Sequence, residues 1–188
     1  MLTTKSSSKE PKLLEVSIET LIIEIAAGNK NAVSKLYEET RAAVYGFALS
    51  ILKNTSDAED VLQETYVKIW TASENYKPMG KPMAWILTIA KNLSLSLLRE
   101  SSKHAEMPEE SSIIDQSVSF SDLAEDRVVL NAAMNKLSDE ERQIIMLYAV
   151  TGLKHIEIAK LLAMPLSTVL SKYSRAKKKL KNTLKEGD

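Results

Sequence analysis

Residues 137–180 read LSDEERQIIMLYAVTGLKHIEIAKLLAMPLSTVLSKYSRAKKKL, and this stretch decides the fold of the chain. Ser138 and Glu141 form a capping box that predicts the start of a helix, and Gly152 ends it because a residue without Cβ tolerates the left-handed cap conformation. A short helix, a tight turn and a long basic helix are expected to follow. The expected elements cover about 139–150, 154–162, 163–165 and 167–184. Two helices joined by so short a turn, the second of them basic, are typical of a helix-turn-helix.

Spacing alone sorts the long basic helix into two faces. The apolar face steps by three or four residues, which predicts burial, and contains Leu166, Val169, Tyr173, Ala176, Leu180 and Leu184. The polar face contains Ser167, Thr168, Ser171, Lys172, Arg175, Lys178 and Lys179. Hydroxyls at a helix N-terminus can reach base edges or phosphates, and cations further along can neutralise phosphates, as in a recognition helix. A terminal amphipathic helix docked on its own domain is the alternative.

The composition favours an all-α protein made of two small domains. The chain has 188 residues, 44% of them hydrophobic, with five Gly, five Pro and no segment that alternates like a half-buried strand. Cysteine is absent and the two histidines are scattered, so we expect no metal site, and a reducing cytoplasm fits. The polar N-terminus and the lack of about 18 consecutive apolar residues argue against secretion and membrane insertion. No feature indicates a cofactor or a small-molecule substrate.

Charge is segregated along the chain, although the formal net charge is zero. Acidic residues dominate between positions 106 and 141, where Arg127 and Lys136 are the only cations. The sign reverses in the last helix, where seven basic residues from Lys172 to Lys185 outnumber the acids. Such a local field suits phosphates, although a solvated basic helix would have the same composition.

A polar segment divides the chain into two parts. Residues 101–121 read SSKHAEMPEESSIIDQSVSFS, and so few apolar residues cannot offset the entropy of ordering the segment. We therefore expect a flexible linker there, between an N-terminal domain over 17–100 and a C-terminal domain over 122–188, with a disordered tail over 1–16. Extended at ~3.3 Å per residue, the linker would reach roughly 65 Å, or about two turns of DNA. The domains could therefore touch separate DNA elements.

The N-terminal domain is expected to be a helical bundle. Ser17 is the predicted N-cap of the first helix, which ends near Gly28. The second helix carries one continuous apolar face through about Leu52. This face is formed by Val33, Leu36, Tyr37, Thr40, Val44, Phe47, Ala48 and Ile51.

The third helix of this domain is expected to present an acidic ridge. A capping box at Ser56 and Glu59 predicts its start, and it runs to about Thr71. The residues expected to face inward are Ala58, Val61, Leu62, Thr65 and Ile69, and those expected to face out are Asp57, Asp60, Gln63, Glu64 and Lys68. DNA would repel such a surface, so a basic protein partner is indicated. An ordinary solvated helix face is the alternative.

A loop and a fourth helix bring aromatic rings next to cations. Pro78, Gly80 and Pro82 predict the loop, and an apolar stripe predicts the helix after it. The stripe is formed by Trp85, Ile86, Ile89, Ala90, Leu93, Leu97 and Leu98. The aromatic and polar residues of interest are Asn75, Tyr76, Lys77, Lys81, Trp85, Lys91, Asn92 and Arg99. Such a set can hold unstacked bases and phosphates, whereas burial in the core is the alternative for Trp85.

Two parts of the chain resemble a known family. DAEDVLQETYVKIW at 57–70, followed by PMAWILTIAKN at 82–92, resembles region 2 of the extracytoplasmic-function (ECF) sigma factors, and residues 137–180 resemble their region 4. The order, spacing and linker length agree with that family. The resemblance implies a non-catalytic sigma factor that binds core RNA polymerase and directs promoter-specific transcription initiation. A cognate anti-sigma factor is the other implied partner.

The resemblance also implies a role for each surface. Core polymerase would be bound by Asp57, Asp60, Val61, Gln63, Glu64 and Lys68. The minus-10 element would be bound by Asn75, Tyr76, Lys77, Lys81, Trp85, Lys91, Asn92 and Arg99, with 75–81 at the place where the family captures a flipped-out base. The minus-35 element would be bound by Ser167, Thr168, Ser171, Lys172, Arg175, Lys178 and Lys179. The linker would follow the polymerase channel toward the RNA exit.

The sequence departs from the family pattern at several positions. Leu170 stands where a basic residue is usual, and Lys172 where Arg is frequent, which removes a bidentate fork. Ala163 replaces a common Gly in the helix-turn-helix turn, and Lys154 replaces a hydroxyl cap worth about 1 kcal/mol. These departures leave the base preference at minus-35 open. Ser96 replaces an acid that is frequent on the minus-10 helix of the family.

Two other functions are compatible with the same helices. A helix-turn-helix regulator would bind operator DNA without polymerase, with the N-terminal domain sensing a ligand or forming a dimer. A helical adaptor would bind proteins only.

Overall fold

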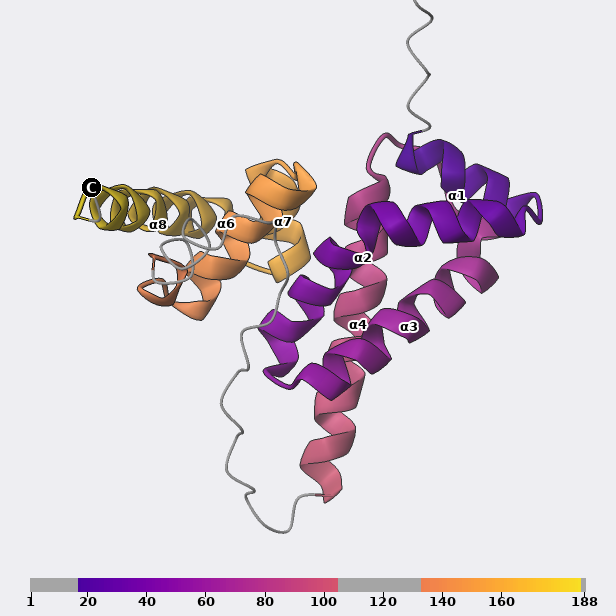
Figure 1. The fold of residues 1–188 in the computed structure, drawn as a ribbon, viewed down its shortest axis with the longest axis horizontal. Helices are drawn as coiled ribbons and strands as arrows, with labels where there is room; N and C mark the ends of the chain where they lie inside the picture. Colours follow the sequence, from indigo (N-terminus) through magenta and orange to yellow (C-terminus); the bar gives the residue numbers. More distant parts are fainter. Residues whose placement is uncertain (1–16, 105–132, 187–188) are drawn as a thin grey trace, which may run out of the picture.

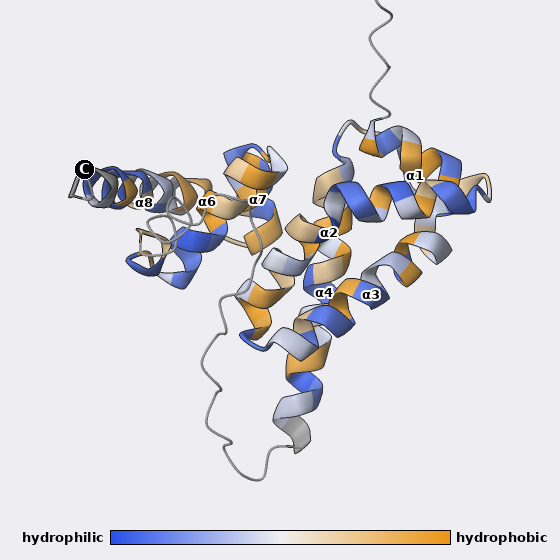
Figure 2. Cartoon of the chain, viewed as in Figure 1, coloured by the Kyte–Doolittle hydropathy of each residue, from blue (hydrophilic) through white to orange (hydrophobic). Residues whose placement is uncertain are grey.

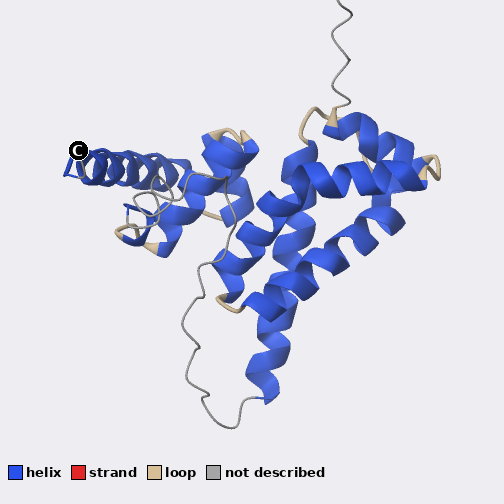
Figure 3. Cartoon of the chain, viewed as in Figure 1, coloured by secondary structure: helices blue, strands red, loops and turns tan. Residues whose placement is uncertain are grey.

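The structure, a computed structural model, describes residues 17–104 and 133–186, and every regular element in these ranges is a helix (Figures 1 and 3). The N-terminal bundle contains α1 (Ile18–Ala26), α2 (Lys30–Leu52), α3 (Thr55–Ala72), the 3-10 turn η1 (Ser73–Asn75) and α4 (Pro82–His104). The C-terminal domain contains α6 (Asp139–Thr151), α7 (His155–Leu162) and α8 (Leu166–Glu186). The prediction of an all-α protein is confirmed. The expected tail at 1–16 and most of the expected linker at 101–121 lie outside the described residues.

The core of the N-terminal bundle is built around α2, which packs against α1, α3 and α4. Leu36, Val44 and Phe47 are fully buried on its predicted apolar face, whereas Tyr37 lies at the margin of the bundle with 36% of its surface exposed. Figure 2 shows hydrophobic residues where these helices meet and hydrophilic residues on their outer sides. Burial of this face, rather than intrinsic helix propensity, is what stabilises helices of this kind.

The helix starts show which capping predictions hold. Ser17 caps α1 as expected, and its side chain accepts a hydrogen bond from the backbone N–H of Thr20. The capping box predicted at Ser56 is wrong, because α3 begins at Thr55 with Asn54 as its N-cap. The Asn54 Oδ1 atom accepts from the N–H of Asp57 at 3.1 Å. Asparagine is as good a cap as serine, and the earlier start adds residues to the helix.

The fourth helix is longer than its apolar stripe. Pro82 occupies the first position of α4, where a missing N–H costs nothing. The helix continues to His104, so the first residues of the expected linker are helical. Leu98, predicted on the buried side, is 40% exposed because this end of α4 projects beyond the bundle (Figure 1).

The C-terminal domain follows the expected order. The capping box of Ser138 and Glu141 begins α6, and Gly152 ends it with a φ of 68°. Ile144, Ile158 and Val169 are fully buried between the three helices. Val169 and Ala176 confirm the predicted buried stripe of α8, but Leu166 is 40% exposed and does not belong to it. The rings of Tyr148, His155 and Tyr173 lie with centroids 4.5 to 4.9 Å apart and join α6, α7 and α8.

The two domains contact each other. Helix α2 packs on α6, and α4 packs on α7. The buried apolar residues of both domains form one continuous cluster, with Met146, Leu162 and Met164 packed against it.

Candidate nucleic-acid and protein interfaces

The loop before α4 is held in shape by a glutamate from α1. The Tyr76 hydroxyl donates to Glu19 Oε1 at 2.8 Å, and the N–H of Gly80 donates to the same oxygen at 3.0 Å. Burial, together with the hydrogen bond to Glu19, raises the pKa of Tyr76 to about 12, so the phenol stays a donor at neutral pH. The ring centroids of Tyr76 and Trp85 lie 4.9 Å apart. The two aromatic rings therefore form a preorganised, half-buried pair.

The polar side chains of the loop and α4 divide into two groups. Asn75, Lys77, Asn92 and Arg99 are exposed. Lys81 and Lys91 instead reach the C-terminal domain: Lys81 Nζ lies 3.2 Å from Glu157 Oε1, and Lys91 Nζ donates to the carbonyl of Leu161 at 2.6 Å. The structure thus brings Tyr76, Lys77, Lys81 and Trp85 to the end of the bundle where α4 begins, whereas Lys91 lies in the middle of α4 and Arg99 near its other end. Two of these cations, Lys81 and Lys91, already contact the C-terminal domain.

The outward face of α3 carries the expected charges. Asp60, Gln63, Glu64 and Lys68 are exposed, and Lys68 lies 3.8 Å from Glu64 in a surface ion pair worth little. Asp57 is half-buried at the first turn.

One residue predicted for the polymerase surface of α3 is in the core instead. Val61 is only 4% exposed, so it can support the ridge but cannot touch a partner. Two residues missed by the sequence reasoning, Val67 at 55% and Trp70 at 38% exposure, add apolar surface beside the charges. The exposure of Val67 and Trp70 could have been predicted from the sequence, because neither residue lies on the inward-facing stripe of the helix.

The polar face of α8 also divides. Ser167, Ser171, Arg175 and Lys178 are exposed and Thr168 is half-buried. Lys172 instead forms an ion pair with Glu140 of α6. Lys179 Nζ lies 2.7 Å from Glu141 Oε2, also on α6. Two predicted DNA-binding cations are therefore engaged by the acidic first turn of α6.

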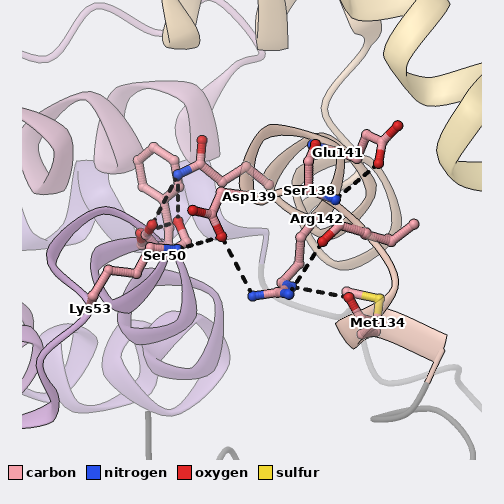
Figure 4. Close-up of polar contacts among 10 residues, drawn as sticks. Ser50, Lys53, Met134, Ser138, Asp139, Glu141 and Arg142 are labelled. Carbon is pink, nitrogen blue, oxygen red and sulfur yellow. Dashed lines mark hydrogen bonds and ion pairs between the residues drawn. The ribbon is translucent and has the colours of Figure 1, made fainter. Parts of the chain in front are cut away.

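Glu141 combines two structural roles in a buried position. The residue is 4% exposed, and its Oε2 atom accepts from the N–H of Ser138 and from Lys179. Burial works against its charge, but the hydrogen bonds from Lys179 and Ser138 outweigh burial and hold the pKa of this carboxyl below its ordinary value. The carboxylate therefore caps the start of α6 (Figure 4) and links it to α8.

Some residues of these surfaces could not be found from sequence. Glu19 lies 57 residues from Tyr76, and an acid in a first helical turn indicates only a favourable dipole interaction. The acids of 139–141 do form a block in the first turn of α6, but spacing could not show that Glu140 and Glu141 face Lys172 and Lys179.

Two kinds of site are absent from the described ranges. Within residues 17–104 and 133–186 no group of His, Cys, Asp and Glu is arranged to hold a metal ion. No helix of those ranges combines the length and the apolar character that crossing a bilayer requires.

Comparison with known proteins assigns a class to each half of the chain. Residues 36–104 match the family model of sigma-70 region 2, and residues 127–180 match that of sigma-70 region 4. The helical bundle and the helix-turn-helix are thus the two domains of a sigma-70-type factor.

Comparison with individual relatives identifies the branch of the sigma-70 family to which the chain belongs. The chain is 29% identical over 181 residues to the ECF RNA polymerase sigma factor SigK of Mycobacterium tuberculosis, covering 93% of this chain and 97% of the relative. It is 30% identical over 176 residues to SigK of Mycobacterium sp. (strain KMS), covering 89% and 90%. The chain belongs to the ECF sigma factors, which are transcription initiation factors of RNA polymerase.

Solved structures share the fold. The sigma factor RpoE of Bartonella quintana, in complex with the anti-sigma factor NepR, has a TM-score of 0.62 at 24% identity, covering 81% of this chain and 96% of that one. CnrH, in complex with the cytosolic domain of CnrY, has a TM-score of 0.57 at 23% identity, covering 90% and 98%.

Proposed function

We propose that this ECF sigma factor divides promoter initiation among three surfaces, one on α3, one around the loop before α4 and one on α8. The observation that carries the proposal is the exposed polar face of α8, which follows a short turn after α7 in a chain of this family. The protein supplies contacts and no catalytic group, and it acts in the cytoplasm, where core polymerase and DNA are found.

The α3 ridge is proposed to bind the clamp of core polymerase. The contact residues are Asp57, Asp60, Gln63, Glu64 and Lys68, flanked by the exposed Val67 and Trp70. Acids surrounding an aromatic residue suit a basic protein surface, because charge steers the encounter and the aromatic contributes buried area. Val61 is left out because it is buried.

The loop and α4 are proposed to open and hold the minus-10 element. Tyr76 and Trp85 provide a preorganised aromatic platform, and their fixed geometry lowers the entropic cost of capturing an unstacked base. The polar contacts are assigned to Asn75, Lys77, Lys81, Lys91, Asn92 and Arg99. Lys81 and Lys91 become available only when their contacts with α7 are broken.

The face of α8 is proposed to bind the minus-35 element. Ser167, Thr168 and Ser171 lie near its N-terminus, where hydroxyls can approach bases and phosphates, while Arg175 and Lys178 neutralise the backbone. Lys172 and Lys179 are proposed to contribute after exchanging Glu140 and Glu141 for phosphate. The exposed Leu170 gives this face an apolar element suited to a thymine methyl group.

A cognate anti-sigma factor is the remaining proposed partner. It is supported by the RpoE and CnrH structures, both of which were solved as complexes, RpoE with the anti-sigma factor NepR and CnrH with the cytosolic domain of CnrY.

Sequencing the RNA made by core polymerase on genomic DNA tests the proposal directly. Adding the protein is expected to create transcripts from a defined set of promoters, and the double variant Arg175→Ala, Lys178→Ala is expected to lose them. Lys30→Ala with Lys35→Ala, which removes two exposed cations from α2, is the matched control. Identical transcripts with and without the protein would refute the proposal.

A gel shift separates this function from its rivals. A sigma factor binds duplex promoter DNA specifically only with core polymerase, whereas an operator-binding regulator binds tightly alone. A protein-only adaptor would be indifferent to the α8 substitutions.

A further inference from the structure

The loop between η1 and α4 is fastened at both of its ends by one carboxylate. Tyr76 begins the loop directly after η1, and Gly80 lies at the other end, just before α4. Both donate to the same Glu19 oxygen, the Tyr76 hydroxyl at 2.8 Å and the Gly80 N–H at 3.0 Å. Hydrogen bonds to a carboxylate are stronger than those between neutral groups. A single residue of α1 therefore sets the distance between the two ends of the loop.

The helix that carries this carboxylate is itself fixed by the core. Helix α1 packs against α2, η1 and α4. Leu21, Ile22 and Ile25 hold it there, since none of them is more than 2% exposed. Glu19 is half-buried in the first turn of this helix. A side chain on a packed helix keeps its position more precisely than one on a loop, so the Glu19 carboxylate is a rigid point of attachment.

Between its two fastened ends the loop projects into solvent. Lys77, Pro78 and Met79 are all exposed, and Met79 is the most exposed large hydrophobic residue of the described ranges, at 73%. Gly80 has a φ of 67°, a left-handed conformation that glycine adopts without strain, so its N–H can turn back toward Glu19. The loop is therefore a short exposed tip on a fixed base.

The contact with Glu19 determines what Tyr76 can offer to DNA. The phenol has one proton, and Glu19 accepts it. The ring remains available beside Trp85, with the two ring planes at 56° to each other. A base can therefore be held by stacking on the Tyr76 ring, which every base allows, but it receives no hydrogen bond from this hydroxyl.

We propose that Glu19 is a positioning residue for minus-10 opening, which does not touch DNA but holds the loop in the shape that receives an unstacked base. The inference rests on the proposed function of this loop. Without the carboxylate the ends of the loop are free to move, and ordering them adds to the free-energy cost of capturing the base. Loss of Glu19 therefore slows the opening step and leaves binding of duplex DNA unchanged.

The opening kinetics of holoenzyme test this role. The probe is a promoter found by the RNA sequencing above, with the fluorescent base analogue aminopurine in its minus-10 element, because aminopurine brightens when it leaves the base stack. The rate of this rise against holoenzyme concentration gives a saturating rate for opening and a half-saturating concentration for duplex binding. Glu19→Ala is expected to lower the saturating rate at least about tenfold, the scale of a lost hydrogen bond to a charged group. The half-saturating concentration should not change, because phosphate contacts made through α8 set it.

Two further variants of α1 distinguish positioning from a general effect on the helix. Glu19→Gln keeps a carbonyl oxygen at the same place, so it is expected to restore most of the opening rate. Glu24→Ala removes another half-buried carboxylate of α1, which accepts from the Asn29 side chain at 3.0 Å, and its opening rate should match that of the parent. Circular dichroism checks that each variant is folded. Equal slowing by Glu19→Ala and Glu24→Ala, or no recovery with Glu19→Gln, would overturn the inference.

A double-mutant cycle with Tyr76→Phe tests whether the phenol acts through Glu19. This substitution removes the hydroxyl and keeps the ring, so in the parent it should slow opening about threefold, as for one lost hydrogen bond of two. In the Glu19→Ala background it should have no further effect, because the hydroxyl has already lost its partner. Equal slowing in both backgrounds would mean that the hydroxyl contacts DNA itself, which contradicts the proposal.

The outcomes separate this inference from the proposed function. An unchanged opening rate in Glu19→Ala, with normal transcripts from the same promoters, overturns the inference and leaves the sigma activity intact. If the parent holoenzyme produces no promoter-specific transcripts, the proposed function itself fails.

Discussion

Ala163, in the turn of the helix-turn-helix, has a φ of 55°, in the left-handed region. A residue with a Cβ is strained there by about 1 to 2 kcal/mol, whereas glycine is not. We expect Ala163→Gly to raise the free energy of unfolding by about 1 kcal/mol, since part of the gain is offset by the greater freedom of glycine in the unfolded chain. Thermal unfolding followed by circular dichroism measures the effect.

The matched control is the other cap of the C-terminal domain. Gly152 has a φ of 68° with open space around its Cα, so Gly152→Ala is expected to cost about 1 kcal/mol through backbone strain alone. A destabilised Ala163→Gly variant would contradict the strain at this turn.

Glu141 is expected to make the C-terminal domain sensitive to acid. Its folded pKa lies below the ordinary value of 4.5, so its contribution is present above that value and is lost as pH falls through the depressed folded pKa. Glu141→Gln should be less stable at pH 7 by about 1 kcal/mol, with a flatter decline of stability in acid. Urea unfolding midpoints between pH 7 and pH ~3 measure both differences.

Glu140→Gln is the control for this titration. Glu140 is adjacent in sequence and also pairs with a lysine of α8, but its side chain is 48% exposed. Exposed pairs contribute about 0 to 1 kcal/mol, so its pH profile should follow that of the parent. An unchanged profile for Glu141→Gln would show that the buried carboxylate does not govern acid stability.

At the scale of the element, α3 makes the clearest prediction. Asp60 and Glu64 are exposed one turn apart on the same face. The double variant Asp60→Lys, Glu64→Lys is expected to weaken binding to core polymerase at least about tenfold, because like charges would then meet across the interface. The folding free energy should change little, and fluorescence anisotropy with core enzyme measures the affinity.

Reversal of Glu38 and Glu39 provides the same change of charge on the exposed side of α2. Equal affinity for the ridge variant and this control would show that polymerase binds elsewhere.

The helices themselves could be predicted largely from local signals. Ser17, Ser138 with Glu141, and Gly152 each act where the sequence placed them, because a cap needs only its neighbours in the chain. The start of α3 was misplaced because Asn54, Thr55 and Ser56 are all capping residues and pattern alone does not rank them. Leu166, which the spacing placed on the buried stripe, is the first residue of α8 and is 40% exposed.

The candidate surfaces were less predictable than the helices. Periodicity identified which face of α8 is polar, but it could not distinguish the exposed Arg175 and Lys178 from Lys172 and Lys179, which reach acids over 30 residues away. Such a distinction depends on tertiary packing, whereas helical spacing describes only one element at a time.

At the scale of the whole molecule, the order of two domains was readable, but their contact was not. The pairs Lys53–Asp139 and Lys81–Glu157 join residues brought together only by packing of the domains. The sequence contains one local sign of this contact, which is Gly46. Glycine is unfavourable inside a helix, so its presence indicates close packing against another part of the fold. Contacts of this kind depend on how the two domains pack, which no pattern within one helix describes.

The carboxylate of Glu19 has a consequence for swapping parts between relatives. The matched region 2 begins at residue 36, so α1 lies before it, yet α1 supplies the oxygen that both Tyr76 and Gly80 use. A chimaera that grafts only the recognised region would transplant the loop before α4 without its anchor. Engineers who exchange promoter preference between such factors should therefore carry the first helix across together with the loop.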